Sequence, residues 1–369
     1  MGRLRTGVVG CGIVAQSRYF PILHRLTDRF IVVGLCDIDP ITLSEAHHTF
    51  PDSSAFRSLA EMLGSPKLEL DAVLLLADGD HHDMLLALAE HGIPTLVEKP
   101  ISYTLPRASH CANEFERQGI TLQVGYMKRQ YEGVRRVARL IEKNDIVSVR
   151  VDLVHPPEDA YLVPVLGRGR PHTGDLIEFL DSATAQEDVA ARLAVLGVQP
   201  NDVVTQRAYF LLATSVIHDV NLIRGLLGDP RKVPLAYFWN GGLAGQIVLA
   251  YSPNLTAFLG FSYIQGGAYE ESVRLVGKRG RWTLRLPSPY PPHLPATLES
   301  VSGSAAEPPV FRSDPVSLLD PFDAQLQEFY RAVAEGGSPQ VGGAEAAGDL
   351  ALVERIIGVA LAGVQDFDE

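Results

Sequence analysis

Residues 4–15 read Leu-Arg-Thr-Gly-Val-Val-Gly-Cys-Gly-Ile-Val-Ala, and this stretch decides the fold. The apolar pair Val8-Val9 is typical of the end of a buried strand, and Gly10-x-Gly12-x-x-Ala15 is typical of a tight turn into a helix. Gly10 permits the turn, Gly12 lets the backbone approach a ligand, and Ala15 lets the helix pack closely on the strand. The stretch therefore predicts a strand, a turn and a helix built around a small ligand.

The ligand expected at such a turn is anionic. The start of the helix offers free backbone N–H groups, those of Ile13 and Val14 first, together with a partial positive charge. A second apolar run, residues 31–36, ends on Asp37, which lies 25 positions after Gly12. This is near the ~20-residue spacing of a carboxylate that binds the adenosine ribose hydroxyls of a dinucleotide. The pattern predicts a dinucleotide site.

Asp37 also indicates which dinucleotide is bound. Its carboxylate would repel the 2′-phosphate of NADP, and no arginine follows it directly, so we expect NAD, with NADP as the alternative. A second interpretation stays open, because Asp39-Pro40 follows and an aspartate here can simply cap the next turn.

Composition excludes several classes of protein. The formal charge of −12 argues against a nucleic-acid surface and against binding to anionic membranes. The three cysteines, Cys11, Cys36 and Cys111, lack metal-ligand spacing, so we expect no metal site and a reducing compartment. We see no signal peptide and no apolar run of ~18 residues, and we expect a cytoplasmic protein.

The chain is long enough, at 369 residues, for two domains. Residues 1–125 alternate strand and helix signals, which predicts an α/β domain with a doubly wound parallel sheet, the Rossmann arrangement. Residues 126–369 predict an α+β domain, because successive strands without helices between them imply an open, mainly antiparallel sheet. The expected strands of that sheet are residues 147–154, 233–239, 245–251, 256–263, 272–277 and 281–286.

Other segments of the second domain have recognisable signals. Thr184-x-x-Glu187 is typical of a capping box that opens a helix over residues 185–196. The prolines of residues 287–295 and the small residues 302–306 predict a long surface loop. Asp320-Pro321 is expected to open a helix, and a last helix, over about residues 344–364, is expected to pack back on the first domain.

Reactive groups are sought at the carboxyl ends of the parallel strands, where ligands of open α/β sheets bind. The loops in question are the turn after Gly12, Asp37, residues 77–82 and Glu98-Lys99-Pro100. Lys99 is the most notable candidate, because the proline after it stiffens the loop and the Lys99–Pro100 peptide bond can be cis. The alternative is a surface lysine before a turn.

These motifs taken together resemble the Gfo/Idh/MocA (glucose–fructose oxidoreductase, inositol dehydrogenase, MocA) family. The resemblance rests on the glycine turn, on Asp37, on His81 seventeen residues before Glu98, on Glu98-Lys99-Pro100, on residues 125–129 and on residues 215–228. It implies a nicotinamide cofactor and a C-terminal sheet used for contacts in a homo-oligomer. It also implies that Lys99 and His218 are catalytic, and that His81, Glu98 and Pro100 lie on the cofactor side.

The substrate side departs from the family pattern. Thr214 stands where an aspartate commonly precedes the histidine by four residues, and Asn221 replaces an acid that follows it. A threonine one helical turn back can hydrogen-bond an imidazole but cannot stabilise an imidazolium as a carboxylate would. Lys128 either touches substrate or belongs to a solvated edge, and His155 either faces the cleft or is a turn residue.

The resulting hypothesis is an NAD(P)-dependent oxidoreductase that interconverts a secondary alcohol and a ketone on a sugar, polyol or similar metabolite. The cofactor takes the hydride, so the protein has to position the carbon and move one proton, for which Lys99 and His218 are suited. Two alternatives remain open. One is redox-assisted cleavage of a glycosidic bond with tightly held NAD. The other is a cofactor-binding regulatory protein without turnover.

Overall fold

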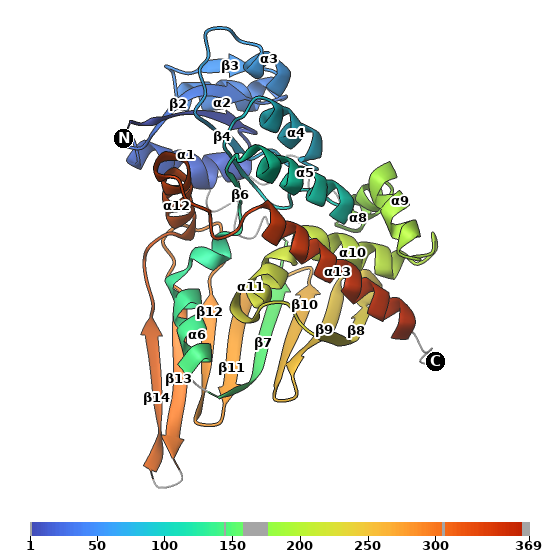
Figure 1. Cartoon of the computed structure of the whole chain (residues 1–369). Helices are drawn as coiled ribbons and strands as arrows, with labels where there is room; N and C mark the ends of the chain where they lie inside the picture. Colours follow the sequence, from blue (N-terminus) through green and yellow to red (C-terminus); the bar gives the residue numbers. More distant parts are fainter. Residues whose placement is uncertain (1, 144, 158–175, 305–306, 364–369) are drawn as a thin grey trace. The chain divides into compact units, whose positions relative to one another are not determined.

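The computed structural model describes the chain except for residues 1, 144, 158–175, 305–306 and 364–369 (Figure 1). It forms two compact units. Unit 1 comprises Met1–Met127 and Pro321–Gly348, and unit 2 comprises Lys128–Asp320 and Asp349–Glu369. The segment 321–348, which the sequence pattern assigned to the second domain, therefore groups with the first unit. Val364, at the expected end of the last helix, lies outside the described residues.

Unit 1 is built on a parallel sheet, as expected, and its six strands have the order β3-β2-β1-β4-β5-β6. The strand order reverses between β1 and β4, because β2 and β3 follow β1 toward one edge of the sheet and β5 and β6 follow β4 toward the other. This is the switch point at which open α/β sheets bind ligands. The strands are β1 (Leu4–Val9), β2 (Phe30–Cys36), β3 (Ser54–Phe56), β4 (Ala72–Leu75), β5 (Thr95–Val97) and β6 (Leu122–Val124).

Helices cover both faces of this sheet, as the fully buried strands β4, β5 and β6 require. The helices of unit 1 are η1 (Ala15–Tyr19, π-helical), α1 (Phe20–Arg25), α2 (Pro40–Thr49), α3 (Leu59–Leu63), α4 (His82–Glu90), α5 (Leu105–Gln118) and α12 (Pro321–Glu335). Helix α12 begins at the predicted Pro321. Its Phe322, Leu326 and Phe329 enter the same core as Val8.

Unit 2 contains an eight-stranded sheet in the order β14-β13-β12-β11-β7-β10-β9-β8. Strands β7 and β10 are parallel and the other described neighbours are antiparallel, as expected for a mainly antiparallel sheet. The strands are β7 (Ile146–His155), β8 (Lys232–Trp239), β9 (Ala244–Ser252), β10 (Leu255–Tyr263), β11 (Glu270–Gly277), β12 (Gly280–Leu286), β13 (Thr297–Ser304) and β14 (Glu307–Pro315).

The long surface loop predicted over residues 287–306 is wrong in its second half. Residues from Thr297 onward form β13, which pairs with β12 and continues into the outermost strand β14. Pro308 and Pro309 lie in the register irregularity between the Ser302–Val310 and Ser304–Glu307 pairs, and Pro315 ends the strand. Edge strands tolerate proline at such positions, where no ladder N–H is required. The prolines and small residues of this segment thus predicted a loop where the chain forms the β13–β14 hairpin.

The helices of unit 2 are η2 (Met127–Gln130, shared with the end of unit 1), α6 (Glu132–Lys143), α8 (Leu176–Thr184), α9 (Glu187–Val195), α10 (Val203–Thr214), α11 (Ile217–Leu227), η3 (Asn240–Gly242) and most of α13 (Gly343–Gly363). The predicted capping box is wrong. Helix α9 starts after Gln186, while Thr184 ends α8 and its hydroxyl donates to the carbonyl of Asp181 (3.2 Å).

The sheet of unit 2 positions two helices that matter for the site. Helices α10 and α11 contact strands β8 and β10 respectively. They are bent by 60° at Ser215 and Val216. Within the described residues no single helix is long and apolar enough to cross a membrane, and these two reach that length only as a bent pair.

Candidate active site

The glycine turn has the geometry that its sequence predicts. Gly10 has a φ of +85°, and a Cβ there would lie 2.2 Å from the backbone nitrogen of Ala77, so no other residue fits. Beside Gly12, in contrast, a Cβ would meet no protein atom within 4 Å. Ile13 and Val14 form the first helical turn, and Ala15 is fully buried. The backbone at Gly12 is thus open to a ligand at the start of a helix.

Asp37 follows β2 directly and is linked to this turn. Its Oδ2 accepts the backbone N–H of Cys11 (2.7 Å), and its Oδ1 accepts the N–H of Asp39 (2.9 Å). The cap of α2 is Asp39, which accepts from the N–H of Thr42 (2.9 Å). The capping role proposed as the alternative for Asp37 therefore belongs to Asp39. Asp37 remains half-exposed beside the glycine turn, so the residues present fit the adenosine side of a dinucleotide.

Lys99 lies in the loop after β5, in a cis peptide bond to Pro100. Glu98 and Lys99 are half-buried and Pro100 is buried. The neighbouring Gly125 makes room for this loop, because a Cβ there would come within 3.1 Å of the Glu98 carboxyl group. The backbone of this loop is therefore packed against the edge of the sheet.

His81 joins two loops at this edge. It is buried at the N-cap position of α4, and its Nδ1 lies 2.7 Å from the carbonyl oxygen of Pro100. Its Nε2 lies 2.8 Å from the carbonyl oxygen of Ala77, the residue against which Gly10 packs. His81 therefore links the lysine loop to the loop beside the glycine turn.

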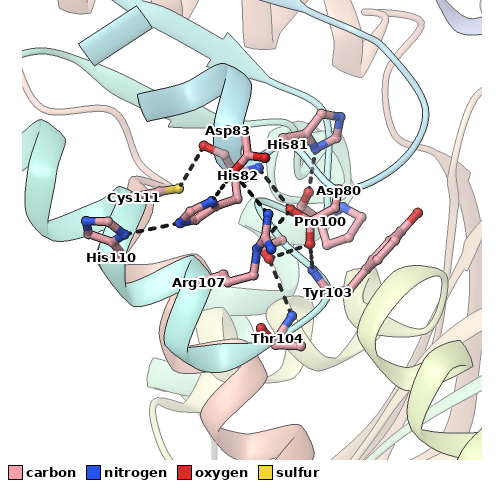
Figure 2. A network of polar contacts seen from close by, with 11 residues as sticks. Asp80, His81, His82, Asp83, Pro100, Tyr103, Thr104, Arg107, His110 and Cys111 are labelled. Atoms are coloured by element: carbon pink, nitrogen blue, oxygen red, sulfur yellow. Dashed lines mark hydrogen bonds and ion pairs between the residues drawn. The ribbon is translucent and has the colours of Figure 1, made fainter. Parts of the chain in front are cut away.

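A polar network continues from His81 along the same loops (Figure 2). Asp80 accepts hydrogen bonds from the Ser102 hydroxyl (2.6 Å) and from the backbone N–H of Tyr103 (3.0 Å). Arg107 on α5 bonds to Asp83 (3.1 Å), which also bonds to the His82 ring (2.6 Å). These contacts fix the chain that follows Pro100 against residues 80–83.

Tyr19 is a residue of this site that sequence reasoning missed. It is completely buried, its hydroxyl donates to Glu98 Oε1 (2.6 Å), and it accepts from Gln325 Nε2 (2.8 Å). Burial raises the pKa of Glu98, while the Tyr19 hydrogen bond and the Lys99 charge act in the opposite direction. No local signal marks Tyr19, because a tyrosine on the apolar face of a helix is ordinarily part of the core.

His218, the second catalytic candidate, lies in unit 2. It is half-buried in the first turn of α11. Thr214 does not lie one turn before His218 on the same helix, because α10 ends at Thr214 and the chain bends before α11 begins. The Thr214 hydroxyl donates to the carbonyl of Phe210 (2.6 Å), which is the usual bond of a threonine inside a helix.

Lys128 is buried, and so is Arg129, so the solvated-edge interpretation is wrong. Lys128 Nζ lies 3.0 Å from Asp219 Oδ1 and 2.9 Å from Glu271 Oε1, and both acids are buried. Burial raises the pKa of Asp219 to about 8 despite the lysine. Burial lowers the pKa of Lys128, but the two acids outweigh it and hold this pKa above its ordinary value. At neutral pH Asp219 therefore keeps its proton, while Lys128 is charged.

The remaining substrate-side candidates also lie in unit 2. Asn221 is fully buried, and its amide donates to Asp349 Oδ2 (2.8 Å). His155 ends β7, stacks on Tyr263 with ring centroids 4.9 Å apart, and places Nδ1 2.8 Å from the carbonyl oxygen of Pro156. Among the described residues, no three His, Cys, Asp or Glu side chains are grouped to hold a metal ion.

The sheet of unit 1, with its glycine turn and an aspartate after the second strand, defines a dinucleotide-binding Rossmann fold. Residues 4–126 match the family described as an oxidoreductase family with an NAD-binding Rossmann fold. Residues 4–126 are thus similar to the NAD-binding Rossmann domain of the Gfo/Idh/MocA oxidoreductase family.

Similarity to individual proteins extends beyond the first unit. The D-apiose dehydrogenase of Paraburkholderia graminis is 25% identical over 365 residues, which cover 95% of this chain and 86% of that protein. The inositol 2-dehydrogenase of Burkholderia multivorans is 30% identical over 146 residues, which cover 39% of this chain and 42% of that protein.

The fold itself matches solved structures along its length. An oxidoreductase from Agrobacterium radiobacter, solved with NAD+, L-tartaric acid and magnesium, superposes with a TM-score of 0.70 at 18% identity. The match covers 98% of this chain and 97% of that one. The WlbA dehydrogenase from Bordetella pertussis, solved with NADH and UDP-GlcNAcA, gives 0.70 at 19% identity and covers 98% of both chains.

Proposed function

We propose that the protein interconverts a secondary alcohol and a ketone on a sugar, polyol or sugar-like metabolite, with Lys99 and His218 handling the proton. One observation carries the proposal. Gly10 packs on Ala77, the Ala77 carbonyl contacts His81, and His81 contacts Pro100, so the glycine turn and the lysine loop form one continuous edge of the sheet.

The cofactor, when bound, supplies or accepts the hydride at its nicotinamide. In the oxidation direction the alcohol carbon loses a hydride and the oxygen loses a proton, which Lys99 or His218 accepts. In the reduction direction the same groups return the proton to the oxygen. A positioned proton-transfer group of this kind is worth ~10²–10⁴ in rate. Lys128, His155, Thr214 and Asn221 are proposed to contribute to the substrate side.

The cofactor is proposed to be NAD rather than NADP. The support is the position of Asp37, whose carboxylate lies after β2 and beside the glycine turn, where it would repel a 2′-phosphate. The substrate class is supported by the names of the relatives, which are D-apiose dehydrogenase and inositol 2-dehydrogenase.

The protein is further proposed to self-associate through the sheet of unit 2. Leu235, Tyr237 and Trp239 alternate along the outermost strand β8 and are 48%, 46% and 41% exposed. Apolar side chains in a row on an edge strand are a common contact between two copies of one chain.

The test is a panel of sugars and polyols with NAD+ or NADP+, followed by absorbance of the reduced nicotinamide. We expect reduction of NAD+ with at least one of them, and little or none of NADP+. Cleavage of a glycoside without net formation of NADH would favour the redox-assisted alternative instead. Cofactor binding without turnover on any of these substrates would contradict the proposal and favour the regulatory alternative.

A further inference from the structure

Tyr19 lies between the half-buried carboxyl group of Glu98 and the side-chain amide of Gln325, and the direction of both hydrogen bonds is fixed by chemistry. An amide nitrogen only donates, so Gln325 Nε2 donates to the Tyr19 oxygen (2.8 Å). The Tyr19 hydroxyl proton then points to Glu98 Oε1 (2.6 Å). A short bond from a neutral donor to a carboxylate is among the stronger hydrogen bonds in proteins.

The three residues come from separate parts of unit 1. Tyr19 ends the π-helical turn that starts at Ala15, immediately after the glycine turn. Gln325 lies on α12, which is fixed by the contact of Phe322 with the Tyr19 ring at 5.6 Å between centroids. A further bond runs from Gln123 Nε2 on β6 to the Gln325 carbonyl (3.0 Å). The donor geometry at Glu98 is therefore held by the helix after the glycine turn, by α12 and by β6.

The groups that face Glu98 are Tyr19, Lys99 and His81. Gly125 adds the backbone on the remaining side, where even a methyl group would crowd the carboxyl group. Burial favours the neutral form of Glu98, and the Tyr19 hydroxyl and the Lys99 charge favour the ionised form. The charge of Glu98 beside Lys99 thus depends on the tyrosine hydroxyl.

We propose that Tyr19 is a positioning residue: its hydroxyl holds Glu98 as an oriented carboxylate beside Lys99, and so couples the helix of the cofactor turn to the loop of the proposed catalytic lysine. This inference rests on the proposed function for its kinetic consequence, but not for its structural one. The chain Gln325–Tyr19–Glu98 would act through Lys99 and would not touch substrate.

The direct test is the titration of Glu98 in Tyr19→Phe, which keeps the ring and removes only the hydroxyl. Glutamate is labelled with ¹³C at the carboxyl carbon, and the Glu98 signal is assigned by its loss in Glu98→Gln. We expect the midpoint of Glu98 to rise by about one pH unit in Tyr19→Phe, because a hydrogen bond to the charged form is lost. Tyr330→Phe is the matched control, since its hydroxyl bonds only weakly to the Gly2 carbonyl at the surface (3.4 Å), and it should leave the midpoint unchanged.

The kinetic readout is the pH profile of kcat with saturating cofactor. In Tyr19→Phe the acid limb should move to higher pH by the same amount as the Glu98 midpoint, with unchanged affinity for NADH. If Tyr19→Phe does not fold, Gln325→Leu replaces it. This variant weakens the polarisation of the tyrosine hydroxyl and should raise the Glu98 midpoint by a smaller amount.

The two proposals fail in different ways. An unchanged Glu98 midpoint in a folded Tyr19→Phe variant, or in Gln325→Leu where that variant replaces it, would overturn the role of Tyr19, whatever the enzyme turns over. Absence of turnover in the unmodified protein would contradict the proposed function, while the titration would still decide whether Tyr19 controls the charge of Glu98.

Discussion

The Lys128 ammonium lies 3.0 Å from the carboxyl group of Asp219, the residue that follows His218 in α11. With Glu271 at 2.9 Å, this cluster places one lysine and two acids inside unit 2. It fixes the first turn of α11, where His218 lies. Two predictions concern this cluster, one for the proton of Asp219 and one for the charge of Lys128.

The first concerns the pH dependence of stability. The folded pKa of Asp219 is about 8, above the ordinary value of 3.8, so between these limits the folded state holds one proton more than the unfolded state. The contribution of Asp219 to the free energy of unfolding is therefore full below pH ~4 and is lost as pH rises to about 8. Asp219→Asn keeps a neutral side chain and should remove this slope, which is at most ~1.4 kcal/mol per pH unit.

Urea unfolding between pH 5 and pH 8 measures this difference. Asp145→Asn is the matched control, because Asp145 pairs with Lys278 at the surface, and it should keep the slope of the unmodified protein. Equal slopes in Asp219→Asn and the unmodified protein would show that Asp219 is ionised in the folded state.

The second prediction concerns Lys128 itself. Lys128→Met leaves two buried acids, Asp219 and Glu271, without their cation, and such a loss typically costs about 3–5 kcal/mol of unfolding free energy. Lys278→Met removes a lysine from an exposed pair and should cost less than about 1 kcal/mol. Chemical denaturation of both variants compares them. A loss of less than about 1 kcal/mol in Lys128→Met would mean that the cluster is hydrated.

The two glycines of the turn are expected to respond differently to the same substitution. Gly10→Ala should prevent stable folding, because its φ is +85° and the methyl group would meet the Ala77 backbone. Gly12→Ala should fold with a similar melting temperature but bind NADH at least tenfold more weakly, since the methyl group occupies the space proposed for the phosphates. Melting curves and NADH fluorescence separate the two effects. Normal NADH affinity in Gly12→Ala would place the cofactor elsewhere.

Self-association is tested on strand β8. Trp239→Arg introduces a charge into the exposed apolar row, next to Tyr237, on which the Trp239 ring stacks at 5.7 Å. We expect the unmodified protein to be an oligomer by light scattering after size-exclusion chromatography, and the variant to be smaller. A monomeric unmodified protein would contradict this proposal.

Much of unit 1 could be predicted because its signals are local. The turn at Gly10, the apolar strands β1 and β4, and the loop at Lys99 each follow from a few adjacent residues. In unit 2 most strands were predicted for the same reason. Strands β13 and β14 were not predicted, because they contain turn-forming residues that a hairpin at the edge of a sheet tolerates.

The parts that could not be predicted depend on distant residues. Tyr19 and Gln325 lie 306 positions apart, so nothing local marks their hydrogen bond. Lysines are rarely buried, and Lys128 is buried only because Asp219 and Glu271 come to it from other elements. Apolar composition alone does not mark the bend before α11, because α10 and α11 are both apolar.

The central claim is that Lys99 takes part in the chemistry and not in holding the cofactor. The most direct measurement is kcat for Lys99→Ala on the best substrate, together with its dissociation constant for NADH and with the exposed Lys67→Ala as control. We predict that kcat of Lys99→Ala falls ~10²–10⁴-fold while its affinity for NADH stays near that of the unmodified protein. In Lys67→Ala both kcat and the affinity for NADH should stay near those of the unmodified protein. A kcat within a few-fold of the unmodified enzyme, with NADH bound equally well, would contradict the account.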